Sequence, residues 1–408
     1  MEPLVQPEPR QFSLATRLVN LWSRHGQRLL QVGIGLMIAA AIWRLGLELP
    51  RLLWGAEEVD AVDLLSRYRE VERWFAGLPV YGAIANGDYP PASHPLLWPW
   101  VGWLGQTATR WFWALTTLLM LGWLSWLGIH EGRAMTRWEK AFIALMPFAL
   151  YPAGAGIRVG QIATHVMPTV VLGLLLLQRS PARPDWRRDL VAAALVIFAM
   201  VKPTVSAPFF WIACFMPGRW RPVLLISVGY LLTALLAVQY QAGNLLTLHF
   251  DWLDHAGTQL GTRGHASIHT WLEAVNLSDW MLPASLLLFG LTGIWTAVYR
   301  RADPWALLSV VAIAARFWVD HQVFDDLLLW VPLIALFRCA RLGATSWMRV
   351  TAGLLFALNW FAMMAPARFL SSGHPLGGIA IPAQTAIWVG ALVFFMALAH
   401  QDVTQETA

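Results

Sequence analysis

The feature that most constrains this chain is a succession of apolar stretches that are each long enough to cross, or nearly cross, a lipid bilayer. A membrane-spanning helix needs about 20 mostly apolar residues, because in lipid every backbone polar group must be hydrogen-bonded within the protein. Only 13% of the 408 residues are charged and the mean hydropathy is +0.52, whereas soluble domains carry about a quarter charged residues. The sequence therefore predicts an all-α, polytopic membrane protein. The apolar stretches lie at about 29–49, 107–129, 138–155, 161–178, 222–240, 282–299, 304–319, 322–338, 347–365 and 381–400.

A further apolar segment, 189–216, is interrupted by Lys202-Pro203. Proline removes a backbone hydrogen bond, and a break at membrane depth is tolerated only against protein or a water-filled cavity. We interpret this segment as a broken helix pair that enters the membrane and returns. The expected fold is a bundle of about 11–12 transmembrane helices that forms one domain over residues 1–408.

Lys and Arg residues indicate the orientation of this bundle. With the N-terminus inside, eighteen of them fall in cytoplasmic segments and eight in outer segments, as the positive-inside rule requires. We expect an inner (plasma) membrane protein with both termini in the cytoplasm and outer loops at about 50–106 and 241–281. This topology also accounts for the net charge of +5, so no nucleic-acid partner is expected.

The first outer loop contains an amphipathic segment at about 58–76. Apolar residues recur there at three- and four-residue steps, which predicts a helix lying along the membrane surface, and Gly77 would end it. Asp63 would sit near its start, where a carboxylate could take a proton from a hydroxyl nucleophile. The alternative is a solvated helix face on which Asp63 pairs with Arg67.

A proline-rich segment follows, from Tyr89-Pro90-Pro91 through His94-Pro95 to Pro99. Its prolines predict an extended entry into the membrane without regular helix, because the residue before a proline disfavours the helical region. This segment would form a rigid wall at the mouth of the bundle, or simply a stiff connector.

Asp63, then Gly77-Leu-Pro-Val-Tyr81, then Tyr89-Pro90-Pro91 before an apolar stretch, resembles the glycosyltransferase 87 family. These are polytopic GT-C-type enzymes that include polyprenyl-phosphate-mannose-dependent mannosyltransferases. Gly160-Gln161 at the start of a membrane helix, Lys202-Pro203, and His321 at the outer start of a late helix continue the resemblance in the same order. The sequence departs from the family pattern at Arg67, where an aromatic residue is common, and around 322–324.

This resemblance implies a GT-C-like bundle that transfers a hexose, expected to be mannose, from a polyprenyl-phosphate sugar to a lipid- or glycan-linked acceptor. Asp63 would be the general base, and substrate contacts would come from Lys202, His321, Arg158, Gln161, Tyr68, Tyr89 and His94. Cationic side chains can hold the departing phosphate, so neither a metal nor a cofactor is required. The membrane lipids, the donor and the acceptor would be the partners of this cell-envelope enzyme.

Structural roles compete with several of these assignments. Lys202 could pair with a structural carboxylate, His321 could contact Asp320 or Asp325, and Arg158 could bind lipid headgroups. Two other functions also remain open. A transporter or flippase of lipid-linked glycans would show corresponding broken segments in two halves of the chain, and an O-antigen-ligase-like polymerase would use a diphosphate-linked donor.

Overall fold

The computed structural model describes residues 14–56, 59–84, 87–178, 185–217, 220–258, 265–370 and 374–407. The N-terminal residues 1–13 and the acidic pair Glu57–Glu58 of the first loop lie outside this described part. Within it the chain is all-helical, with seventeen α-helices, three short 3-10 helices and no strand. The helices are α1 (Leu14–Trp54), α2 (Val62–Phe75), α3 (Ser93–Val101), α4 (Gln106–Glu131), α5 (Arg137–Ala149), α6 (Tyr151–Val159), α7 (Ala163–Gln178), α8 (Trp186–Ala199), α9 (Pro203–Phe215), α10 (Trp220–Val238), α11 (Leu245–Thr258), α12 (Ile268–Ala274), η1 (Ser278–Trp280), α13 (Met281–Val298), α14 (Pro304–Phe317), η2 (Asp325–Leu329), α15 (Trp330–Leu342), α16 (Ser346–Met364), η3 (Ala367–Leu370) and α17 (Gly377–Thr407).

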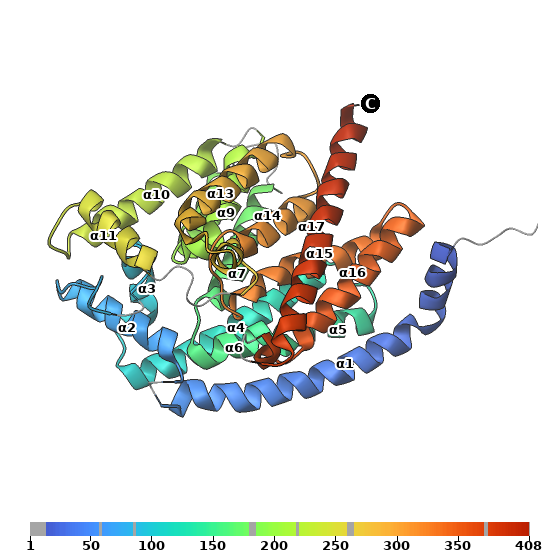
Figure 1. The fold of residues 1–408 in the computed structure, drawn as a ribbon, viewed down its shortest axis with the longest axis horizontal. Helices are drawn as coiled ribbons and strands as arrows, with labels where there is room; N and C mark the ends of the chain where they lie inside the picture. The colour runs from blue at the N-terminus through green and yellow to red at the C-terminus, as the bar shows by residue number, and fades with distance from the viewer. Residues whose placement is uncertain are drawn as a thin grey trace, which may run out of the picture.

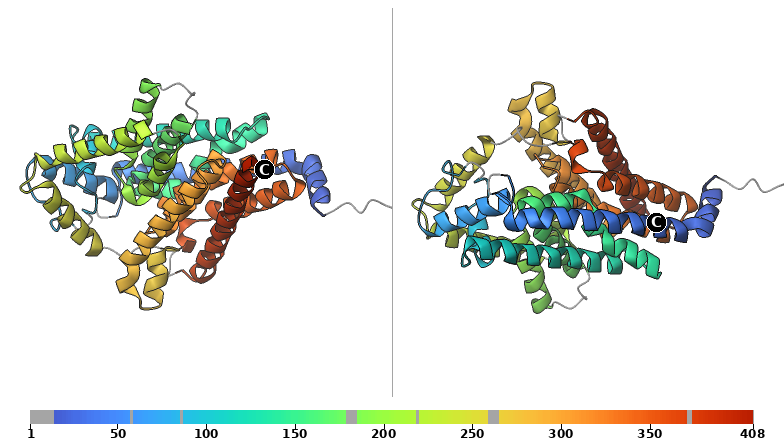
Figure 2. Two further views of the ribbon diagram at one scale, coloured as in Figure 1. Left: turned by 90° about the horizontal axis from the view of Figure 1, so that it is seen from above. Right: turned by 90° about the horizontal axis from the view of Figure 1, so that it is seen from below.

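The short helices α2, α3 and α11 gather at one end of the bundle, on the left in Figure 1. The long helix α1 runs along one side from this end, and α4 lies beside it in the right-hand view of Figure 2, which is seen from below. Helices α7 and α14 form the centre, since nearly all their side chains are buried. One continuous hydrophobic core joins residues from α1 to α17.

The outer helices expose their apolar side chains. Leu, Ile, Val and Trp residues of α1, α10, α13 and α17 are widely exposed, and a surface of this kind is stable only in lipid. Five helices of the described part are long and apolar enough to cross a membrane, or six if the bent pair of α5 and α6 is one span. These are the helices of a multi-pass membrane protein.

The number of helices long enough to cross a membrane is smaller than the 11–12 spans expected from the sequence. Several predicted spans do form apolar helices, but α7, α9 and α14 have only 16, 13 and 14 residues. At 1.5 Å per residue, each is shorter than the roughly 30 Å hydrocarbon layer. The break at Lys202-Pro203 is confirmed, because α8 ends at Ala199 and α9 begins at Pro203. A second break, not expected from sequence, bends the span 138–155 by 40° between α5 and α6.

The two predictions for the first loop have different outcomes. An amphipathic helix does form, and it ends as expected before Gly77, which has a φ of 72°. However, α2 is embedded in protein rather than lying on a surface, because Arg67 and Glu70 on its polar side are buried together with Leu64 and Trp74.

The expectation of an extended proline segment is wrong over its second half. Ser93–Val101 forms α3, with Pro99 inside the helix. Pro95 stands in the first turn of α3, where backbone N–H groups have no partner within the helix, so a proline is tolerated there. Ser93 then donates its hydroxyl to the carbonyl of Val201 at 2.8 Å, which joins α3 to the turn that carries Lys202.

Candidate active site

Asp63 stands in the first turn of α2, and the start of α2 is fixed to the C-terminal end of α6. Ala61 precedes the helix with a φ of 56° and donates its backbone N–H to the carbonyl of Arg158 at 2.9 Å. The Arg158 guanidinium pairs with Asp60 at 2.9 Å. Arg158 is therefore engaged with a neighbouring carboxylate and anchors the start of α2, instead of standing free for a phosphate.

A glycine allows α2 to approach the turn between α6 and α7. Gly160 ends α6 with a φ of 71°, and a Cβ atom built on it would lie 2.5 Å from Cβ of Leu64. Glycine adopts this left-handed conformation without the penalty that other residues incur. Gln161 follows directly, so the absence of a side chain at Gly160 brings Gln161 beside Asp63.

Gln161 orients the Asp63 carboxylate. Its Nε2 donates to Oδ2 of Asp63 at 2.9 Å. Its Oε1 accepts from the backbone N–H of Ile162 at 2.9 Å and from the hydroxyl of Tyr89 at 3.3 Å. Because two donors face Oε1, the amide can present only its N–H₂ to Asp63. Three predicted site residues, Asp63, Gln161 and Tyr89, are thus joined in one network.

The Asp63 carboxyl is half-buried and has an unusual acidity. Burial raises its pKa to about 6, although the positive charges of Arg67 and Lys202 act in the opposite direction. A base of this pKa is unprotonated for most of the time at neutral pH and still binds a proton readily.

Charged residues of α2 and of the loop that follows it lie beside this network. Arg67 forms ion pairs with Glu70 at 2.9 Å and Asp88 at 3.2 Å, and its guanidinium carbon lies 3.8 Å from the centre of the Tyr89 ring. Burial raises the pKa of Glu70 to about 8 even though Arg67 opposes the shift. The sequence alternative placed Arg67 on a solvated face, but the side chain is buried and links α2 to the Tyr89 loop.

Lys202 and His321 converge on a third residue, Asp325, which is the first residue of the buried 3-10 helix η2. Nζ of Lys202 lies 2.6 Å from Oδ1 of Asp325, and Nδ1 of His321 lies 3.2 Å from Oδ2. The other ring nitrogen of His321 contacts the carbonyl of Ala315 at 2.8 Å. A proton on each nitrogen would satisfy both oxygens, whereas burial opposes the charged ring. The structural alternatives named for Lys202 and His321, pairing with a carboxylate and contact with Asp325, are both observed.

The two groups of residues share one environment. The charge of Lys202 lowers the pKa of Asp63, and that of Asp325 raises it. The two groups meet at Gly156. A Cβ atom built on Gly156 would lie 3.8 Å from the Cβ of Gln161, which contacts Asp63, and 3.8 Å from the Cβ of Phe324, which directly precedes Asp325. Asp63 and Lys202 therefore act on each other electrostatically across the turn between α6 and α7.

Tyr68 and His94 do not join this network through the contacts described. Tyr68 is half-buried and packs on the hydrophobic core. His94 is buried and stacks on Trp74, with 4.1 Å between the ring centres. Burial and the charge of Arg67 lower the pKa of His94 to about 3. A neutral ring cannot serve as a cationic phosphate ligand, so the donor-binding role expected for His94 has no electrostatic support.

A cavity of about 380 Å³ opens at the same end of the bundle, between the residues after α2 and helix α11. Trp74, Tyr81, Asp251, Asp254 and His255 are among its lining residues, and Asp63 is not. The Tyr81 hydroxyl donates to the carbonyl of Tyr89 at 2.9 Å. Tyr81 therefore connects this cavity to the network of Tyr89, Gln161 and Asp63 through its hydrogen bond to Tyr89.

Sequence reasoning left a second buried ionic cluster without a role. Arg316 pairs with Asp326, which also accepts a hydrogen bond from Tyr151, and Gln384 donates to the Tyr151 hydroxyl at 2.8 Å. The cluster joins α6, α14, η2 and α17. The adjacent acids Asp325 and Asp326 thus pair with different cations. The signals in the sequence were an arginine in an apolar helix and, ten positions later, the second residue of an Asp-Asp pair.

Comparison with known proteins gives no match: no family model matches the chain, and neither a curated protein nor a solved structure matches it. The functional proposal therefore rests on the residues, their geometry and the resemblance of the motifs.

Proposed function

We propose that the protein is a GT-C-like membrane glycosyltransferase that moves a hexose from a polyprenyl-phosphate sugar to a hydroxyl acceptor on the non-cytoplasmic face. The observation that carries this proposal is the Asp63 carboxyl, held by Gln161, with a pKa of about 6 and within electrostatic reach of a lysine at a broken membrane helix. An ionisable residue at such a break marks a functional site by default.

In the proposed reaction the acceptor oxygen attacks the anomeric carbon as its proton passes to Asp63. The bond between that carbon and the phosphate oxygen breaks, and the polyprenyl phosphate leaves with the bonding electrons. A single displacement of this kind inverts the anomeric centre. Lys202 would stabilise the charge on the leaving phosphate, since an ammonium group has three N–H donors and the contact with Asp325 uses one of them.

The decisive experiment substitutes Asp63→Asn in the full-length protein and measures transfer of radiolabelled mannose from polyprenyl-phosphate mannose in membranes of expressing cells. A positioned base contributes about 10²- to 10⁴-fold, so transfer should fall by about that factor. Glu72→Gln is the matched control, because Glu72 lies on the same helix as Asp63 and its side chain is exposed. Transfer by Asp63→Asn at the wild-type rate would refute the assignment of the base.

A transporter of lipid-linked glycans is the second candidate, and the bend between α5 and α6 favours it. Together with the break at Lys202 it gives two interrupted helices around Gln161, and such helices are common at transport sites. Reconstituted vesicles distinguish the candidates: a transporter moves the labelled lipid across the bilayer without a covalent product. A diphosphate-linked oligosaccharide as the accepted donor would instead indicate the ligase-like polymerase.

A further inference from the structure

A second cavity, of about 310 Å³, lies far from the candidate active site. It is bordered by the end of α7 at Gln178, whereas α7 begins beside Gln161. Sixteen residues of α-helix extend about 24 Å. This cavity, which we call the α7-end cavity, is therefore about one helix length from Gln161, the hydrogen-bond partner of Asp63.

Two adjacent arginines give the α7-end cavity a positive charge. Arg300 and Arg301 follow α13 and line the cavity, and among its lining residues in the described part of the chain none is Asp or Glu. The carboxylate closest in sequence, Asp303, is engaged elsewhere. Its Oδ1 accepts from the first backbone N–H groups of α14 at 2.8 and 3.3 Å, and its Oδ2 lies 3.4 Å from the Arg338 guanidinium. The cavity thus presents two guanidinium groups to a ligand.

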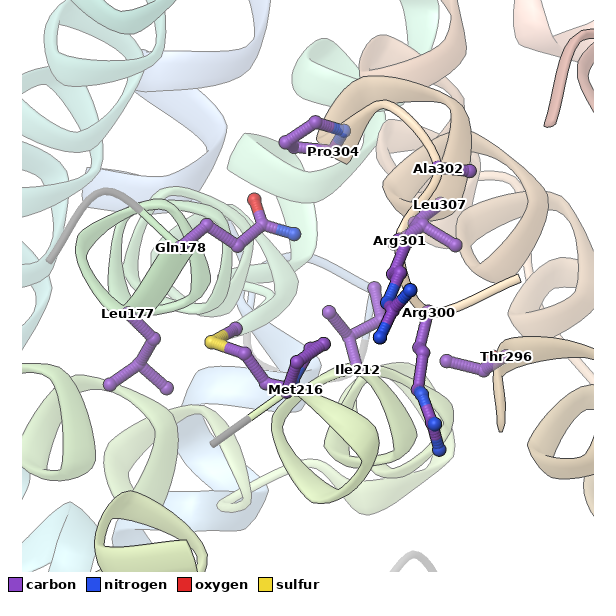
Figure 3. Close-up of a pocket in the computed structure, with 11 residues that line it drawn as sticks. Leu177, Gln178, Ile212, Met216, Thr296, Arg300, Arg301, Ala302, Pro304 and Leu307 are labelled. Carbon is purple, nitrogen blue, oxygen red and sulfur yellow. The ribbon is translucent and has the colours of Figure 1, made fainter. Parts of the chain in front are cut away.

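The opposite wall provides a hydrogen-bond acceptor. The Oε1 atom of Gln178 is buried and has no hydrogen-bond partner within the described part of the chain. Figure 3 shows the Gln178 side chain on one side of the cavity and Arg301 on the other, with Ile212 and Met216 between them. A buried acceptor without a partner costs about 1–3 kcal/mol, so a ligand that carries a hydroxyl donor would be favoured here.

The remaining lining is mostly apolar, since the hydroxyl of Thr296 already donates to the carbonyl of Thr292, and apolar side chains continue onto the exposed surface of α13. Ile212, Met216 and Leu307 line the cavity. On α13, which leads to the arginines, Ile294 and Val298 are 64% and 61% exposed. A ligand with acyl chains can therefore lie along α13 while its polar part enters the cavity.

We propose that the α7-end cavity binds the headgroup of an anionic phospholipid. The phosphate would pair with Arg300 and Arg301, a headgroup hydroxyl would donate to Oε1 of Gln178, and the acyl chains would lie along α13. Arginine forks match phosphate oxygens in geometry as well as charge. The site is independent of the proposed transfer chemistry, because none of its residues belongs to the Asp63 network.

The test measures binding of dioctanoyl-phosphatidylglycerol to the purified full-length protein in detergent, with dioctanoyl-phosphatidylcholine and glycerol phosphate as comparison ligands. The double variant Arg300→Gln/Arg301→Gln should bind phosphatidylglycerol at least about tenfold more weakly, since bonds between charged partners are among the strongest polar contacts. Arg137→Gln is the control, because Arg137 is an exposed arginine at the start of α5 and lies outside the cavity. It should bind within about twofold of wild type.

Gln178→Leu separates the two halves of the site. It should remove the preference for phosphatidylglycerol over dioctanoyl-phosphatidic acid, which lacks the headgroup hydroxyl, and leave binding of phosphatidic acid in place. Wild-type affinity in the double variant at an unchanged melting temperature would overturn the proposal. Equal affinity for glycerol phosphate and phosphatidylglycerol would overturn the assignment to a lipid.

Discussion

At the scale of single residues, Asp63 is distinguished by its neighbours more than by its position in the sequence. Gln161 fixes one carboxylate oxygen, and burial places the pKa near 6. Neither effect is visible in the sequence, because Gln161 is separated from Asp63 by 98 positions. The motif order suggested both residues, but their contact depends on the approach of α2 to Gly160.

The acidity of Asp63 predicts how the proposed transfer depends on pH. A base must be unprotonated to act, so the rate should rise with pH, pass half of its maximum near pH 6 and then level off. Rates at saturating donor, measured from pH 5 to 9, should show this limb in wild type and lose it in Asp63→Asn. A rise in rate with its midpoint near pH 8 would indicate Glu70 as the base instead, since burial raises the pKa of Glu70 to about 8.

The contact between Lys202 and Asp325 predicts an asymmetric response to substitution. Lys202→Met leaves a buried carboxylate without its cation, which should cost about 3–5 kcal/mol of stability. The double variant Lys202→Met/Asp325→Leu should recover much of this loss, because no uncompensated charge remains. Melting temperatures of the purified proteins measure the effect.

The same double variant separates packing from function. If Lys202 stabilises the leaving phosphate, the double variant should regain its melting temperature and still transfer no sugar. Recovery of both stability and transfer would show that Lys202 has a structural role alone.

At the scale of helices, amphipathic periodicity predicted α2 but not its surroundings. The polar side of α2 is buried because Arg67 forms ion pairs with Glu70 in the same helix and with Asp88 in the loop before α3. Proline content misled the prediction for α3, since Pro95 stands in the first turn, where a proline does not oppose helix formation. The broken helix at Lys202 was predictable, because a cation and a proline share one apolar stretch.

The approach of α2 to the turn after α6 predicts a strong effect of Gly160→Ala. A left-handed conformation costs an L-residue about 1–2 kcal/mol, and the added methyl would also press on Leu64. We expect a lower melting temperature and reduced transfer, because α2 must move away from Gln161. Gly122→Ala is the matched control, since a Cβ atom there would meet nothing within 4 Å. Normal transfer by Gly160→Ala would show that the close approach is not needed.

At the scale of the whole molecule, composition predicted an all-helical membrane protein, and the structure agrees. The number of spans was less predictable. Apolar length alone does not distinguish a helix that crosses the bilayer from a shorter one surrounded by other helices. In the centre, α14 is buried along nearly its full length, so its 14 residues contact protein where an isolated span would contact lipid.

The orientation predicted from the arginines can be tested with single cysteines. Cys214 and Cys339 are first replaced by Ala. Ala83→Cys lies in an exposed position near α2, and Met135→Cys lies in the exposed loop after α4. A membrane-impermeant maleimide added to intact cells should label position 83 and should label position 135 only after permeabilisation. The reverse pattern would place Asp63 in the cytoplasm.

Helix α2 is tied to the bundle at both of its ends. At its start Ala61 bonds to Arg158, and at its finish the indole of Trp74 donates to Ala237 while Gln241 donates to the carbonyl of Trp74. Swinging α2 outward would break all three bonds, each worth about 1 kcal/mol, and expose the buried Trp74 and Leu64. Because α2 is held at both ends, the proposed function favours a donor that is dissolved in the bilayer and approaches Asp63 between helices, without displacing α2.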